Sequence, residues 1–169
     1  MAPSGPPRRV RLGAYAICRD SAGRLLLCHV APGLLDAGRW TLPGGGVEFG
    51  EHPADAALRE LREESGLDGE LGAVEFVHSL LVPPGQSSSG QELHLVGVVY
   101  AVRVTGGRLR PEVDGSTDGC VWHDLAAASR LELTDLARQA LDLVTARKRR
   151  LGRWSERSPG HPEDQHRPQ

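Results

Sequence analysis

Residues Gly45–Leu67 read GGVEFGEHPADAALRELREESGL, and this segment carries the most informative pattern in the chain. Pro53 is the residue type that suits the first turn of a helix, and Gly66 is the type that most often follows the last turn. The two residues occur in the order that a helix requires. The sequence therefore predicts a helix over Pro53–Ser65.

Three glutamates, Glu60, Glu63 and Glu64, are spaced so that their carboxylates share one face of this helix. Segment 45–67 holds six acids and two arginines, so its net charge is −4, against −2 for the whole chain. Carboxylate oxygens are the ligands that Mg²⁺ and Mn²⁺ prefer, so the cluster favours a divalent cation. Taken alone, such a run is more typical of a solvated acidic helix face.

Two further features surround the acidic helix. The consecutive glycines Gly44–Gly46 allow a tight turn and a close approach of backbone carbonyl groups to a metal ion. Arg59 lies on the same helix, and its planar guanidinium can hold Glu51 by two parallel hydrogen bonds. We therefore expect the glycine-containing loop to be fixed to the helix.

The complete spacing resembles the signature of the Nudix hydrolases, G-x5-E-x7-R-E-U-x-E-E-x-G-U, where U is a bulky aliphatic residue. Every signature position matches between Gly45 and Leu67, with Leu61 and Leu67 in the aliphatic places. The preceding segment Gly38–Gly45 also resembles the lead-in that is common in the family. Nine matching positions over 23 residues make a solvated acidic face a much weaker interpretation.

The resemblance implies an α/β fold, namely an α/β/α sandwich around a mixed β-sheet in a single domain. It implies hydrolysis of a nucleoside diphosphate linked to a further group, with Mg²⁺ as the cofactor and Mn²⁺ as an alternative. By position, Glu60, Glu63 and Glu64 would bind the metal, and Gly45 would lend it a backbone carbonyl. Glu51 and Arg59 would complete the catalytic residues as supports that fix the glycine loop to the helix.

The general base stays open, because family members place it either in the helix or in a later loop. It is either Glu60 or a later acid. The later candidates are Glu92, Glu112, Asp114 and Asp118. For the substrate, Arg39 and Trp40 are candidate binding residues, and a position in the core is the competing interpretation of Trp40. We expect Tyr15 in the core.

The nucleotide also stays open. Pro83 follows the signature by 16 residues, which resembles the proline spacing in ADP-ribose-hydrolysing members, although a plain Pro-Pro-Gly loop is the favoured interpretation. The short chain suits a nucleoside triphosphate pyrophosphohydrolase as well. A non-catalytic nucleotide-sensing module on the same fold is the alternative function, but such modules typically lose signature glutamates, and none is missing here.

The domain is expected over residues 9–147, between a flexible segment 1–8 and a basic, disordered tail 148–169. Apolar runs around a glycine-containing turn predict a hairpin of Leu12–Cys18 and Arg24–Val30. Strands are also expected at Ala73–Val82 and Leu93–Val104, and a helix at Leu133–Arg147.

Composition narrows the class of protein. With 169 residues and a net charge of −2, the chain suits one domain and argues against stable nucleic-acid binding. No apolar run is long enough for a membrane span. Three cysteines without a CxxC spacing predict reduced thiols and a cytoplasmic protein. The expected partner is a nucleotide-type small molecule, and the sequence allows a homodimer without indicating one.

Overall fold

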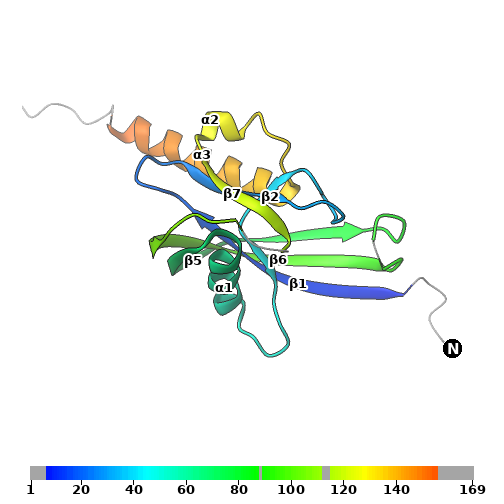
Figure 1. The fold of residues 1–169 in the computed structure, drawn as a ribbon. Coiled ribbons are helices and arrows are strands. Elements are labelled where there is room, and N and C mark those ends of the chain that lie inside the picture. The colour runs from blue at the N-terminus through cyan, green and yellow to red at the C-terminus, as the bar shows by residue number, and fades with distance from the viewer. Residues whose placement is uncertain (1–6, 88, 112–114, 156–169) are drawn as a thin grey trace, which may run out of the picture.

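The computed structural model of the chain describes residues 7–87, 89–111 and 115–155. Along the described chain, four strands precede a helix, three strands follow it, and two helices come last (Figure 1). In chain order, they are β1 (Arg8–Cys18), β2 (Leu25–Val30), β3 (Trp40–Thr41), β4 (Gly44–Gly46), α1 (Pro53–Ser65), β5 (Leu67–Val82), β6 (Glu92–Gly107), β7 (Thr117–His123), α2 (Leu125–Ala128) and α3 (Asp135–Ser155).

The strands form two sheets. The larger one has the order β4-β1-β6-β5, in which β1 runs parallel to β6 and the other neighbours are antiparallel. The smaller one is antiparallel, with the order β3-β2-β7. Helix α1 covers one side of the strands, and α2 and α3 cover the other (Figure 1). The expected layered α/β domain with mixed strand pairing is confirmed.

Strand β2 explains how the layers hold together. Leu25 and Leu27 are fully buried in the apolar cluster under α3, whereas Leu26 is fully buried in the cluster under α1. Alternate residues of a strand point to opposite faces, so an unbroken apolar run is what a strand between two helical layers needs. The same alternation on β1 directs Ala16 toward α1 and Ile17 toward α3.

Helix α1 has the predicted bounds because its end signals are local. The His52 side chain accepts a hydrogen bond from the Ala54 amide at 3.1 Å, and Pro53 occupies the first turn. Gly66 ends the helix in the left-handed conformation, with φ of 72°, and donates its amide to the Arg62 carbonyl. Glycine adopts this conformation without steric cost, which fixes the end of the helix.

The predicted hairpin is wrong. A turn does occur, since Gly23 donates its amide to the Asp20 carbonyl, but β1 and β2 belong to different sheets and are joined only by an isolated bridge between Arg19 and Leu25. Both edges of β1 are taken by β4 and β6, and both edges of β2 by β3 and β7. Each of the two strands therefore pairs with strands from elsewhere in the chain, and the expected pairing of β1 with β2 does not form.

Helix α3 starts at Asp135 and continues past the expected end at Arg147 to Ser155. Its start is capped by Thr134, whose hydroxyl oxygen accepts a hydrogen bond from the Ala137 amide at 3.2 Å. Of the expected flexible segment 1–8 and disordered tail 148–169, residues 1–6 and 156–169 lie outside the described part, whereas Arg8 begins β1 and residues 148–155 belong to α3. Within the described part, no helix combines the length and apolar character that crossing a membrane requires.

Candidate active site

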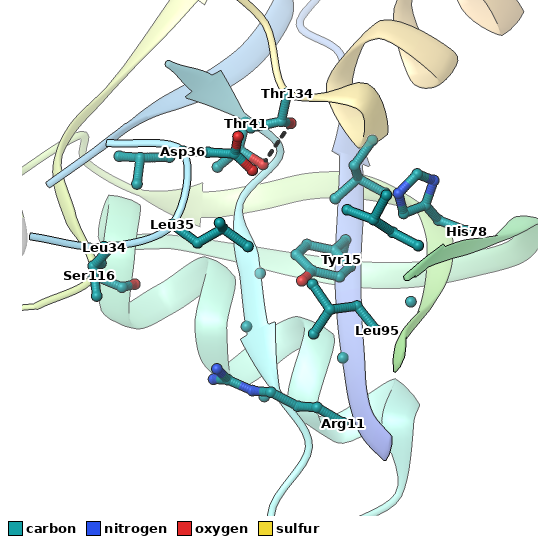
Figure 2. Close-up of a pocket in the computed structure, with 18 of the residues that line it drawn as sticks. Arg11, Tyr15, Leu34, Leu35, Asp36, Thr41, His78, Leu95, Ser116 and Thr134 are labelled. Carbon is teal, nitrogen blue, oxygen red and sulfur yellow. Dashed lines mark hydrogen bonds between the residues drawn. The ribbon is translucent and has the colours of Figure 1, made fainter. Parts of the chain in front are cut away.

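Helix α1 borders a cavity of about 590 Å³. The cavity lies against one face of β1, β5 and β6 and is closed by β4, α1 and the segment before β3 (Figure 2). Of the expected metal ligands, Glu60, Glu64 and Gly45 line it. The i, i+4 spacing and the turn at β4 thus bring two carboxylates and a backbone segment to one wall of a ligand-sized pocket.

Arg59 donates hydrogen bonds to both the glycine loop and helix α1 at this wall of the cavity. Its Nε and Nη2 donate to the two Glu51 carboxylate oxygens at 2.8 and 3.0 Å, which is the expected bidentate pair. Nη2 also donates to the Gly46 carbonyl at 3.1 Å. Nη1 donates to Glu60 at 2.8 Å and to Glu63 at 3.0 Å. One guanidinium therefore ties loop and helix together and offsets repulsion among the acids.

The pKa of Glu51 falls from an ordinary 4.5 to about 2, chiefly because Arg59 donates hydrogen bonds to the ionised carboxylate and secondly because the Glu48 amide does. The ionised form is thus favoured by folding. Its stabilising contribution is complete above pH 4.5 and is lost as the pH falls toward 2. We expect the Glu51→Gln variant to be less stable than the wild type at neutral pH, with the gap closing over that window.

Urea unfolding of both proteins at several pH values between 7 and 2 measures this gap. If the difference in the free energy of unfolding stays constant down to pH 2, the Arg59–Glu51 pair does not favour the ionised carboxylate in the folded state.

Glu64 is buried, with 1% of its surface exposed. Its Oε2 accepts a hydrogen bond from the Gly44 amide at 2.9 Å, and its Oε1 accepts one from the Ser116 hydroxyl at 2.9 Å. A buried carboxylate is costly unless it is hydrogen-bonded. These two donors therefore hold the Glu64 carboxylate in one orientation at the wall of the cavity.

Glu63 differs from its two neighbours. Its side chain is 49% exposed, pairs with Arg59 and does not line the cavity described above. Among the described residues, no three His, Cys, Asp or Glu side chains are gathered closely enough to hold a metal ion together. The structure thus brings Glu60 and Glu64 to the cavity, whereas Glu63 is not among the described residues that line it.

The glycines of β4 allow this packing. A Cβ atom on Gly45 would lie 2.7–2.8 Å from the carboxylate of Glu60, whereas one on Gly44 would collide with the Ala14 carbonyl and lie 2.6 Å from the Tyr15 Cα. A flexible carboxylate can move aside, but backbone cannot. We therefore expect Gly45→Ala to fold with near wild-type stability and to lose activity, by about 10–100-fold.

The matched variant is Gly44→Ala. Because Gly44 also has a φ of 146°, which L side chains rarely adopt, we expect this variant to lose at least about 1–3 kcal/mol of stability. Thermal unfolding and steady-state rates separate the two outcomes. A fully active Gly45→Ala protein would show that the position of the Glu60 carboxylate is not critical.

Other walls of the cavity come from residues that the sequence did not single out. Arg11 extends from β1 beside the glycines, and Asp36 and Thr134 lie at the opposite end (Figure 2). Tyr15 packs against the apolar cluster under α3, as expected, and also lines the cavity. Burial raises its pKa, so the phenol stays protonated at neutral pH. An exposed arginine on a strand carries no local signal that could have identified Arg11.

The two proposed substrate residues have different surroundings. Arg39 lines the cavity, and its Nη1 donates to Asp36 at 3.1 Å. Trp40 is not one of the described residues that line the cavity. Its ring makes edge-on contacts with His29 and His123, at centroid distances of 5.1 and 4.7 Å, and it packs on the core. Of the two interpretations that the sequence left open for Trp40, these contacts favour the core position.

The candidates for the general base that follow the signature differ in where the structure places them. Asp118 pairs with Nδ1 of His29 at 2.8 Å, and Glu92 pairs with Arg8 at 2.7 Å. Neither lines the cavity. Glu112 and Asp114 lie outside the described residues. Of the described candidates for the general base, Glu60 alone borders the cavity.

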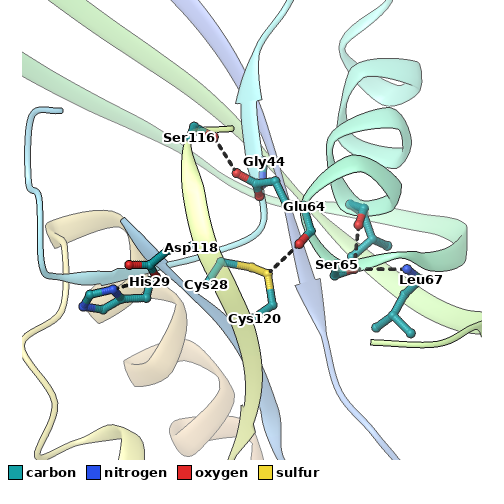
Figure 3. Close-up of a disulfide and its surroundings, with 10 residues drawn as sticks. Cys28, His29, Gly44, Glu64, Ser65, Leu67, Ser116, Asp118 and Cys120 are labelled. Carbon is teal, nitrogen blue, oxygen red and sulfur yellow. Dashed lines mark hydrogen bonds and ion pairs between the residues drawn. A yellow bond between two sulfur atoms is a disulfide. The ribbon is translucent and has the colours of Figure 1, made fainter. Parts of the chain in front are cut away.

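Cys28 on β2 and Cys120 on β7 form a disulfide, so the expectation of reduced thiols is wrong for this pair (Figure 3). The two residues face each other in the β2–β7 register, with Cα atoms 3.9 Å apart, although 92 positions separate them in sequence. Cys18 is free and buried, and burial raises its pKa to about 12. The Cys120 sulfur lies 3.5 Å from the Glu64 carbonyl, so the bridge adjoins the end of α1.

Comparison with known proteins matches this geometry. A family model described as the NUDIX domain matches residues 9–144. The crystal structure of a MutT NUDIX hydrolase from Burkholderia pseudomallei is similar, with 30% identity, a TM-score of 0.66, and coverage of 80% of this chain and 98% of that one.

Two curated relatives match over shorter stretches. An RNA pyrophosphohydrolase of Gluconacetobacter diazotrophicus is 42% identical over 67 residues, or 37% of this chain and 39% of the relative. An ADP-ribose pyrophosphatase of Methanocaldococcus jannaschii is 36% identical over 73 residues, or 43% of this chain and 40% of the relative. The chain thus matches no more than 40% of the length of either relative. From the extent of the family match, from the solved neighbour and from the site itself, it follows that this chain belongs to the Nudix hydrolase family.

Proposed function

We propose that the protein is a metal-dependent pyrophosphohydrolase that cleaves a nucleoside diphosphate linked to another group. One observation carries the proposal: Glu60 and Glu64 stand together on the wall of a cavity of about 590 Å³, against the glycine turn of β4. Nucleotide-sized ligands bind in cavities of this size. Relatives named RNA pyrophosphohydrolase and ADP-ribose pyrophosphatase support the reaction class.

The donor set fits a hard divalent cation. Glu60 and Glu64 offer carboxylate oxygens, Gly45 offers a backbone carbonyl, and the missing Cβ of Gly45 leaves room beside Glu60. Glu63, one residue before Glu64 on α1, is the further ligand that the signature implies. Bound Mg²⁺ or Mn²⁺ would neutralise phosphate oxygens and lower the pKa of a bound water.

The protein's own groups would prepare the site for the reaction. Arg59 holds Glu51, Glu60 and the loop in place, and Gly44 and Ser116 orient Glu64. We assign to Glu60 the acceptance of the proton from the attacking water, since Asp118 and Glu92 are paired away from the cavity. Tyr15 and the leucines around it supply an apolar wall that excludes water from part of the pocket.

The proposed substrate is a nucleoside triphosphate or an ADP-ribose-like compound. A chromatographic screen for the nucleotide products, with Mg²⁺ or Mn²⁺, over nucleoside triphosphates, ADP-ribose, NADH, nucleotide sugars and dinucleoside polyphosphates tests the reaction and identifies the substrate. Activity that disappears on chelation supports the proposal. Tight binding of one compound without hydrolysis of any would contradict it and favour the nucleotide-sensing alternative.

A further inference from the structure

One of the arginines near the cavity has no carboxylate partner among the described residues. Arg59 is engaged with three glutamates, and Arg39 pairs with Asp36. Arg11 also lines the cavity, yet it forms no ion pair with any of the described residues. A cation that lines a pocket and is not matched to an internal carboxylate is available for an anionic ligand.

The position of Arg11 is fixed by the sheet. It lies on β1, on the same face as Gly13 and Tyr15, and opposite Leu95 of β6 in the register. Its side chain reaches toward β4, where Nη2 and Nε lie 3.2 and 3.6 Å from the place that a Cβ on Gly46 would occupy (Figure 2). A side chain at position 46 would push the guanidinium away, so the glycine admits it to the site.

Arg11 is also electrostatically close to the two cavity glutamates. The Tyr15 hydroxyl interacts with all three groups: burial raises the pKa of Tyr15 most, Arg11 lowers it, and Glu64 and Glu60 raise it. Arg11, Glu60 and Glu64 therefore act electrostatically on one phenol and line the same cavity.

We propose that Arg11 binds the diphosphate group of the substrate by donating hydrogen bonds from its guanidinium to a phosphate in this cavity. This inference rests on the proposed function. Glu60 and Glu64 repel an anionic substrate wherever a metal ion does not neutralise them, so a cation in the same cavity would keep the phosphate from turning away. A guanidinium suits this task better than an ammonium, because two of its N–H groups can donate to one phosphate in a planar fork.

The test compares Arg11→Ala and Arg11→Lys with Arg9→Ala. Arg9 lies two residues earlier on β1, is exposed and is not among the described residues that line the cavity, so it matches the loss of charge without touching the site. Titration calorimetry measures the binding of inorganic pyrophosphate in the presence of Mn²⁺, and separately of Mn²⁺ alone. Steady-state rates with the substrate from the screen give kcat and KM, with and without added guanidinium ion.

We expect Arg11→Ala to weaken pyrophosphate binding and to raise KM by at least about tenfold, with Mn²⁺ affinity within about twofold of the wild type. Arg11→Lys should recover only part of the loss, added guanidinium should partly rescue Arg11→Ala, and Arg9→Ala should match the wild type. Wild-type pyrophosphate binding by Arg11→Ala would overturn the assignment. An equal loss of Mn²⁺ binding would also overturn it, since the role would then be structural.

These experiments distinguish a failure of the proposed hydrolase function from a failure of the Arg11 assignment. If the wild-type protein hydrolyses nothing in the screen, but binds pyrophosphate in a manner that depends on Arg11, the anion site stands and the catalytic proposal falls. If hydrolysis occurs and Arg11→Ala retains wild-type KM and pyrophosphate affinity, the catalytic proposal stands and the assignment of Arg11 to the anion site falls.

Discussion

Replacement of Glu60 by glutamine should lower the rate of hydrolysis by about 100-fold or more, while the protein remains folded. The change removes one negative charge from the cavity wall and with it the proposed metal ligand and proton acceptor. Groups that merely support metal ligands commonly contribute about 10–100-fold, so a direct ligand should exceed that range. Steady-state rates at saturating Mg²⁺, together with thermal unfolding, measure both parts of the prediction.

Glu64→Gln should lose as much activity and also some stability. The Glu64 carboxylate accepts hydrogen bonds from the Gly44 amide and the Ser116 hydroxyl, and an amide NH₂ placed toward the Gly44 N–H would leave a buried donor unpaired. Such a loss costs about 1–3 kcal/mol. The control is Glu70→Gln, an exposed glutamate on β5 that pairs with Arg103 away from this cavity. Wild-type turnover in both Glu60→Gln and Glu64→Gln would remove the metal-site assignment.

Reduction of the Cys28–Cys120 disulfide should destabilise the fold by about 2–5 kcal/mol, because the bridge closes a long loop in the unfolded chain. For a protein of this length, each kcal/mol shifts Tm by about 2–4 °C. We therefore expect a lower Tm in the presence of dithiothreitol, and a similarly low Tm for the double variant Cys28→Ala/Cys120→Ala. Calorimetric scans with and without reductant measure the change.

The double variant also serves as the control, since dithiothreitol should leave its Tm unchanged. Thiol titration of the denatured, unreduced wild type should find one free thiol, Cys18. A count of three thiols in protein purified under oxidising conditions would show that the bridge does not form.

Local signals were sufficient for helix α1 and for the acidic face. Pro53, Gly66 and the spacing of the glutamates act within a few residues, so the helix has the predicted bounds and Arg59 binds Glu51 as expected. Strands β1, β2, β5 and β6 were also located, because apolar runs mark them, whereas the short strands β3 and β4 were not predicted. Their pairing was not predicted, since an apolar run does not encode which neighbour will cover each edge, and the expected hairpin was therefore wrong.

From the residues alone came the family, the layered fold class and the identity of the acidic helix, all of which depend on short-range spacing. The three-dimensional packing decided which carboxylates face the cavity, that Trp40 packs on the core, that Cys28 meets Cys120, and that Arg11 lines the same cavity as Glu60 and Glu64. Each of these depends on strands far apart in the chain being brought into register. Sheet pairing, and not local sequence preference, creates such contacts.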